Sequence, residues 1–373
     1  MKILFVFGTR PEAIKMAPLI KTFQGDPRLK TVVCVTGQHK EMLYQVLEFF
    51  KIQPAYDLAL MKPDQTIYDI TSAVLAGLKD ILDKETPDLI FVQGDTTTAF
   101  TGALAGYYNQ VKVAHLEAGL RSGNMYSPFP EEGNRILAGH LASYHLAPTQ
   151  NAVDNLAAEG INKNVYKVGN TVIDALLLGL DILKSSDQKD IEKQFEDIDL
   201  SKRIILVTGH RRESFGEPFE NMVNAIKEIA ENYSDVEVVY PVHLNPNVRG
   251  IVNKVLSNTP NIHLIEPLDY PSLIWLMEKS YFVLTDSGGI QEEAPTLGKP
   301  VLVMRDITER QEGIEAGTAK LVGTNKQVII DESIKLLDDP SAYDKMARAV
   351  NPYGDGSTSK QVLEIINFTQ ANQ

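Results

Sequence analysis

Short, continuous apolar runs recur along the chain, and each is followed by a polar turn and then by a helical pattern. Examples are residues 3–7, 88–92 and 281–285. Runs of this kind are typical of parallel strands that are buried on both faces. Strands alternate with helices in a first block up to residue 168, and the pattern restarts at residue 203. The sequence therefore predicts an α/β protein with two doubly wound parallel sheets.

Composition narrows the possible functions. The chain has 373 residues, 43% of them hydrophobic and 23% charged, which suits a soluble globular protein with two cores. The net charge is −13 and there is no basic stripe, so we expect no nucleic-acid partner. No apolar run is long enough to cross a membrane, and the first one is too short for a signal peptide, so we expect a cytoplasmic protein. Cys34 is the single cysteine, which excludes an internal disulfide.

The stretch 284–300 (LTDSGGIQEEAPTLGKP) is the most informative local pattern. A strand that leads through Ser287, Gly288 and Gly289 into a helix directs backbone N–H groups at one point, where a phosphate could bind. The glycines would let an anion approach the backbone closely. Glu293 follows on the predicted helix, 290–297, where it could reach ribose hydroxyls. For the tripeptide alone, a serine N-cap at an ordinary βα turn is the better interpretation.

Polar side chains follow the carboxyl ends of many of the predicted strands. Open α/β sheets bind ligands along that edge, so two such edges facing each other would form one cleft. A set that combines carboxylates, histidines and arginines indicates a functional site. Its members are Arg10, Asp95, Glu117, His210, His243, Ser287 and Arg310.

The motifs also limit the chemistry. No G-x-G-x-x-G pattern follows the first strand of either block, and no Walker lysine motif is present, so we expect no nicotinamide cofactor. A metal site built from Asp95, His115, Glu117 and His210 lacks zinc-type spacing, and we expect none. For His115 a hydrogen-bonded structural role is the better interpretation. Carboxylates and imidazole remain as proton carriers, which favours an acid–base enzyme for a nucleotide sugar or a phosphate ligand.

Taken together, several motifs resemble those of the non-hydrolysing UDP-N-acetylglucosamine 2-epimerases of bacteria, in order and over nearly the whole chain. Besides the stretch 284–300, the motifs are residues 8–18 (GTRPEAIKMAP), 94–98 (GDTTT), 117–121 (EAGLR), 127–132 (SPFPEE), 208–213 (TGHRRE), 241–246 (PVHLNP) and 351–356 (NPYGDG).

The resemblance implies a GT-B-like fold with two Rossmann-like domains and an active site in the cleft between them. It places residues 1–169 and a C-terminal helix, 355–373, in the first domain and residues 170–354 in the UDP-binding domain. Composition alone places a boundary in the polar stretch 184–203. The implied reaction interconverts UDP-N-acetylglucosamine and UDP-N-acetylmannosamine through elimination and re-addition of UDP, without a cofactor, for surface-polysaccharide synthesis. A homodimer is also implied.

The resemblance further assigns roles to individual residues. Asp95, Glu117 and Glu131 match the catalytic carboxylates, and His210 matches a histidine near the diphosphate. Leu273 replaces an aromatic residue that lies near the uracil in some members. The positions that match the UDP-sugar site are Arg10, Lys15, Asp95, Glu117, His210, Leu273, Ser287, Gly288, Gly289, Glu293 and Arg310.

Some bacterial members bind a second substrate molecule as an activator. Gln38, Glu131, Arg211 and His243 match that site, whereas Glu41 and Asp64 stand where some regulated members carry glutamine and arginine. The alternatives on the same scaffold are a hydrolysing epimerase, an epimerase of a modified UDP-sugar and, less favoured, a retaining glycosyltransferase. A catalytically idle UDP-sugar sensor is disfavoured because all three carboxylates are present.

Overall fold

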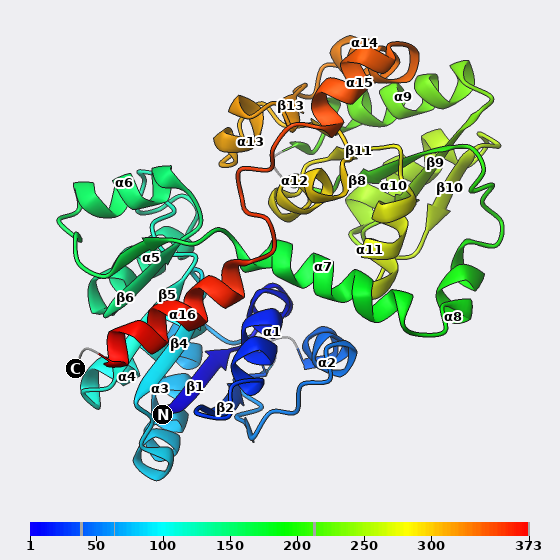
Figure 1. Ribbon diagram of the computed structural model, residues 1–373. Helices are drawn as coiled ribbons and strands as arrows, with labels where there is room; N and C mark the ends of the chain where they lie inside the picture. The colour runs from blue at the N-terminus through cyan, green and yellow to red at the C-terminus, as the bar shows by residue number, and fades with distance from the viewer. Residues whose placement is uncertain (38–39, 63, 212–213, 372–373) are drawn as a thin grey trace. The chain divides into compact units, whose positions relative to one another are not determined.

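The computed structural model describes residues 1–37, 40–62, 64–211 and 214–371 (Figure 1). The chain forms two compact units, one made of Met1–Leu178 and Tyr353–Gln373, the other of Gly179–Pro352. The division lies inside helix α7 (Thr171–Lys184), later than residue 169 and earlier than the polar stretch 184–203. The first turns of α7 belong to unit 1, because Val172 and Ile173 pack against Tyr353 there.

Unit 1 contains a parallel sheet of seven strands in the order β3-β2-β1-β4-β5-β6-β7. Chain order reverses between β1 and β4, as expected for a doubly wound sheet, and ligands bind at such a switch point. The strands are β1 (Lys2–Phe7), β2 (Lys30–Val35), β3 (Tyr56–Asp57), β4 (Leu89–Gln93), β5 (Lys112–Leu116), β6 (Tyr144–Ala147) and β7 (Val165–Lys167).

The first strand shows why this sheet needs apolar residues on both faces. Phe5 stacks on Phe91 of β4 with ring centroids 5.1 Å apart, and Phe23 of α1 meets both rings edge-on. Leu4 and Val6 point to the opposite face, where they join a separate cluster with α3 and α4. Cys34 lies in that cluster, and burial raises the pKa of its thiol to about 12, so it is a core residue rather than a nucleophile.

Helices cover both faces of this sheet. Helix α1 starts at a capping box in which Thr9 and Glu12 satisfy each other's backbone N–H groups. Helix α16, from the end of the chain, packs against α1, which returns the C-terminus to unit 1 (Figure 1). Besides α7, the helices are α1 (Arg10–Gln24), α2 (Lys40–Phe49), α3 (Ile67–Glu85), α4 (Thr97–Tyr108), α5 (Glu131–Leu141), α6 (Gln150–Ala158) and α16 (Thr358–Ala371).

Unit 2 contains a parallel sheet of six strands in the order β10-β9-β8-β11-β12-β13. The prediction of two parallel, doubly wound α/β sheets is therefore confirmed. The strands are β8 (Arg203–Thr208), β9 (Val236–Pro241), β10 (Ile262–Ile265), β11 (Phe282–Thr285), β12 (Val301–Val303) and β13 (Ala319–Leu321).

The helices of unit 2 include one correction. The helix predicted over 290–297 starts earlier and changes type midway, because Pro295 cannot donate the next α-helical hydrogen bond. The helical segments are α8 (Lys189–Glu192), η1 (Lys193–Phe195), α9 (Glu217–Asn232), α10 (Pro246–Leu256), α11 (Tyr270–Lys279), α12 (Gly288–Glu293), η3 (Ala294–Leu297), α13 (Gln311–Glu315), α14 (Lys326–Asp338) and α15 (Pro340–Ala347). Within the described residues no helix is long and apolar enough to cross a membrane.

Candidate functional site

Glu117 is a buried carboxylate at the carboxyl edge of the unit 1 sheet. It follows β5 directly and has a positive φ of 62°, a backbone conformation that is costly for a residue other than glycine. Its Oε1 accepts hydrogen bonds from Lys15 Nζ at 2.5 Å and Asn170 Nδ2 at 3.0 Å, and its Oε2 accepts one from Gln93 Nε2 at 2.5 Å. Three donors, one of them the cation Lys15, therefore stabilise this side chain as a carboxylate.

Asp95 lies after the neighbouring strand β4 and has a different environment. Arg135 Nη2 of α5 donates to its Oδ2 at 2.5 Å, and Asn134 Nδ2 donates to its backbone oxygen at 2.9 Å. Burial raises the pKa of Asp95, the charges of Glu117 and Glu131 raise it further, and Arg135 and Lys15 lower it. A carboxyl group with a raised pKa beside a cation is suited to accept and return a proton.

Two buried glutamates attach the loops of this edge to one another. Glu12 accepts from the backbone N–H groups of Gly8 and Thr9 with one oxygen and from the Thr96 hydroxyl with the other. Glu132 accepts hydrogen bonds from the backbone N–H groups of Ser122 and Gly123, and its Oε2 lies 3.5 Å from Arg135 Nη1. Glu131, the third predicted carboxylate, is the first residue of α5. These contacts fix the loops that carry Asp95 and Glu117 and the start of α5, which carries Glu131.

His115 has the structural role that the sequence favours. Its Nε2 is hydrogen bonded to the backbone oxygen of Gly94, next to Asp95, at 2.7 Å. Burial lowers its pKa to about 4, so the ring is neutral at physiological pH. Among the described residues no three His, Cys, Asp or Glu side chains are arranged as metal ligands.

In unit 2 the predicted phosphate-binding turn lies at the carboxyl end of β11. The N–H of Ser287 donates to the hydroxyl of Thr285 at 2.9 Å, and α12 starts at Gly288. Arg310 lies against this turn, because a Cβ on Gly288 would be 3.4 Å from its Cζ. Its Nε donates to the buried carboxylate of Glu292 at 2.6 Å. At this turn the backbone of the glycines therefore lies beside the guanidinium of Arg310, which Glu292 holds in place.

Helix α11, which carries Leu273, contacts Glu293 of α12 through Tyr270. The Tyr270 hydroxyl donates to Glu293 Oε1 at 3.3 Å, and Glu293 is buried. Leu273 lies one helical turn beyond Tyr270 on α11 and is half-buried. Glu293 is therefore oriented by a neighbouring helix, as a residue that binds ribose would need to be.

His210 follows β8, and the backbone around it is anchored to Asp286. The N–H groups of His210 and Arg211 donate to Asp286 Oδ2 at 2.6 and 2.7 Å. The imidazole ring stacks on that of His243, with centroids 4.6 Å apart and planes 2° from parallel. The structure thus places two predicted activator residues, Arg211 and His243, beside His210. Gln38 lies outside the described residues.

Comparison with known proteins identifies the chain. Residues 21–367 match the family model described as UDP-N-acetylglucosamine 2-epimerase. The chain belongs to this family. It is similar to UDP-N-acetylglucosamine 2-epimerase of Escherichia coli K12, with 53% identity over 98% of both chains.

Two solved structures extend the comparison to three dimensions. The UDP-GlcNAc 2-epimerase of Neisseria meningitidis bound to UDP-GlcNAc shares 49% identity and a TM-score of 0.91, covering 99% of this chain and 100% of that one. The enzyme of Methanocaldococcus jannaschii in complex with UDP-GlcNAc and UDP shares 33% identity and a TM-score of 0.82, with the same coverage. The prediction that this chain is an isomerase, a UDP-N-acetylglucosamine 2-epimerase, is confirmed by the family model and the curated relative.

The residue roles predicted from the sequence of this epimerase stay predictions. The structure adds further residues to the candidate site, to which the sequence alone assigned no role. These share one property: each contacts a predicted site residue through a side chain from another segment. A strand-end position indicates a candidate residue but not the partner that lies beside it in space. The added residues are Gln93, Arg135 and Asn170 in unit 1, and Tyr270, Asp286 and Glu292 in unit 2.

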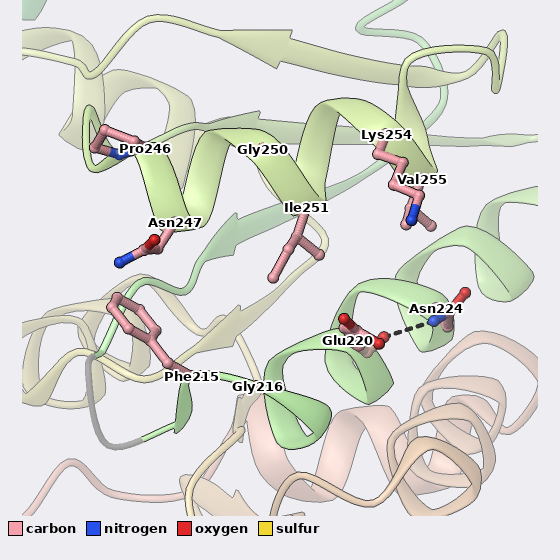
Figure 2. A pocket seen from close by; sticks show the side chains of 10 residues that line it. All are labelled: Phe215, Gly216, Glu220, Asn224, Pro246, Asn247, Gly250, Ile251, Lys254 and Val255. Atoms are coloured by element: carbon pink, nitrogen blue, oxygen red, sulfur yellow. Dashed lines mark hydrogen bonds between the residues drawn. The ribbon is translucent and has the colours of Figure 1, made fainter.

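Two hollows near the site segments contain none of the predicted site residues. Figure 2 shows the larger one, with a volume of 740 Å³, between α9 and α10; Phe215, Pro246 and Ile251 lie along it. Its one hydrogen bond among the residues drawn runs from Asn224 Nδ2 to the Glu220 backbone oxygen. The smaller one, of 360 Å³, lies beside Pro130 and is lined by apolar and aromatic side chains such as Tyr126 and Phe129. Neither brings titratable groups together in a way that adds to the epimerase chemistry.

Proposed function

We propose that this epimerase works by elimination and re-addition of UDP. The C2 proton of the sugar is not next to a carbonyl group, so its simple removal would leave an unstabilised carbanion. Removal of that proton together with departure of UDP from C1 gives 2-acetamidoglucal and UDP instead. Protonation of C2 on the other face and return of UDP to C1 then produce the epimer.

The observation that carries this proposal is the pair of ion-paired carboxylates in unit 1. Glu117 binds Lys15 and Asp95 binds Arg135, at N–O distances of 2.5 Å in both pairs. An epimerase that acts on two faces of one carbon needs two groups that can exchange protons with it. Asp95, Glu117 and Glu131 are the candidates, and Asp95 combines a raised pKa with a side chain that is 31% exposed.

Departure of UDP needs groups that stabilise a diphosphate, and we assign these to the predicted residues. Gly288 and Gly289, which follow Ser287 at the start of α12, offer backbone N–H groups, and Arg310 lies against the same turn. Arg10 and His210 are the further candidates for diphosphate contact, with Glu293 for the ribose and Leu273 for the base. Preorganised donors of this kind typically stabilise a transition state by about 3 kcal/mol each.

Two other outcomes are open on the same scaffold. A hydrolysing epimerase would release free N-acetylmannosamine and UDP, and an epimerase of a modified UDP-sugar would prefer a decorated substrate. The product that we propose serves surface-polysaccharide synthesis in the cytoplasm, and a homodimer is expected from the family. Activation by a second substrate molecule at Arg211, Glu131 and His243 is part of the same proposal.

Proton NMR in D₂O tests the reaction. The purified protein is incubated with UDP-N-acetylglucosamine in EDTA, with no added cofactor. We expect UDP-N-acetylmannosamine with deuterium at C2, because the proton passes through side chains that exchange with solvent. Immediate accumulation of N-acetylmannosamine and UDP would support the hydrolysing reaction, and an unchanged sugar would contradict both.

A further inference from the structure

The carboxylate of Asp286 is the feature of unit 2 that the proposed roles do not use. It follows β11 directly and is fully buried. Its Oδ2 accepts two backbone N–H groups, whereas its Oδ1 has no hydrogen-bond partner among the described residues. A buried carboxylate oxygen without a hydrogen bond is energetically costly, so a donor that reaches Oδ1 would stabilise it.

The group closest to meeting that need is the imidazole of His210. Its Nδ1 lies 3.9 Å from Asp286 Oδ1, too far for a hydrogen bond but within reach of a small side-chain rotation. The His210 side chain is 45% exposed, so one edge of the ring faces Asp286 while the ring is still accessible. Hydrogen bonds between catalytic side chains are often long in the absence of a ligand and shorten when the ligand binds.

His243 supports the His210 ring from its face. Asn245 donates its N–H to His243 Nδ1 at 3.1 Å, so this nitrogen is an acceptor and carries no proton. A neutral ring stacked on His210 limits the directions in which His210 can turn and adds no positive charge.

We propose that Asp286 is the positioning residue of His210: when UDP is bound, Asp286 Oδ1 accepts a hydrogen bond from Nδ1–H of the imidazole and so directs Nε2 towards the diphosphate. An acceptor at Nδ1 fixes the tautomer and stabilises the charged form of the ring. His210 can then place positive charge where the C1–O bond breaks. This inference rests on the proposed function, in which His210 contacts the diphosphate.

The variant Asp286→Asn tests the proposal. Its amide oxygen can still accept the N–H groups of His210 and Arg211, but the amide nitrogen then faces Nδ1 and can only donate. We expect kcat to fall about 10- to 100-fold, as for other partners that orient a working histidine, with KM changed much less. Asp174→Asn is the matched control, because Asp174 is also buried and accepts a backbone N–H, from Ser359 at 2.7 Å, within unit 1. This control should retain the wild-type kcat.

A double-mutant cycle separates positioning from a structural effect. If Asp286 acts through His210, Asp286→Asn will have no further effect on kcat in a His210→Gln background. An equal loss of kcat in both backgrounds would overturn the proposal. The same holds if Asp286→Asn has wild-type kcat.

A measurement on the unsubstituted protein covers the case in which Asp286→Asn does not fold. In the complex with UDP, ¹⁵N NMR of labelled histidine, assigned with His210→Gln, should show a proton on Nδ1 of His210. An Nδ1 without a proton would overturn the inference. Absence of epimerisation by the wild-type protein would instead contradict the proposed function, and the Nδ1 result could still be obtained with UDP alone.

Discussion

Replacement of Arg135 by methionine should shift the pH dependence of the reaction, because Arg135 is the cation beside Asp95. The guanidinium donates to Asp95 Oδ2 at 2.5 Å, and its charge lowers the pKa of a carboxyl group that burial raises. An opposite charge this close lowers a carboxyl pKa by about 1–3 units. Because the Asp95 side chain is 31% exposed, solvent screens part of the effect, and we expect the lower part of that range, about 1–2 units.

The sign of the shift follows from the charge. Without the cation the pKa of Asp95 rises, so less of the ionised base is present at a given pH, and the acidic limb of kcat/KM moves to higher pH by about 1–2 pH units. This corresponds to about 1.4–2.7 kcal/mol of lost interaction with the ionised carboxylate. The assay measures kcat/KM from pH 5 to 9, with the reaction monitored by NMR.

Arg203→Met is the control for this experiment. Arg203 is also a partly buried guanidinium with an ion-pair partner, Asp235, but it lies in unit 2. Its removal can lower stability, yet the acidic limb should stay in place. An unchanged limb in Arg135→Met would refute the expectation that, among the three candidate carboxylates, Asp95 is the one whose ionisation sets the acidic limb.

Three further substitutions test other parts of the account. Glu117→Gln keeps the size of the side chain but removes its charge. It should lower kcat at least 100-fold while the unfolding transition stays that of the wild type. Near-normal turnover would contradict a role of Glu117 in proton transfer. Gly288→Ala places a Cβ 3.4 Å from Arg310 Cζ. It should weaken the binding of UDP, measured by calorimetry, about tenfold. An unchanged affinity would show that UDP does not contact this turn. Phe91→Ala removes the ring that packs on Phe5 and Phe23. It should lower the free energy of unfolding in urea by about 3–5 kcal/mol. A decrease below about 1 kcal/mol would mean that the core closes around the cavity.

The fold is predictable from the sequence where burial leaves a clear pattern. The strands at residues 3–7 and 203–207 are recognisable because both of their faces are covered, which requires continuous apolar runs. The short strands β3 and β13 lack this signal, since they contain only two and three residues and include Asp57 and Lys320 at the edges of the sheets. The change of helix type before Pro295 depends on local backbone geometry and is likewise absent from the apolar pattern.

The candidate site divides in the same way. Asp95, Glu117, His210 and Ser287 are recognisable because each comes shortly after a strand, and parallel strands end at one edge of their sheet. Their partners come from distant segments: Arg135 is 40 residues beyond Asp95, and Asn170 is 53 residues beyond Glu117. Asp286 lies within the most informative motif of the chain, but only the structure shows that its carboxylate contacts the loop after β8.

Positional isotope exchange tests the central claim, cleavage of the C1–O bond during epimerisation, most directly. The substrate is UDP-N-acetylglucosamine with ¹⁸O in the bridge between C1 and the β-phosphorus, and ³¹P NMR follows the label. Free rotation of the departed diphosphate should move ¹⁸O into the non-bridging positions of recovered substrate and of UDP-N-acetylmannosamine. Complete retention of ¹⁸O in the bridge, while the C2 proton exchanges and the epimer forms, would contradict elimination and re-addition of UDP.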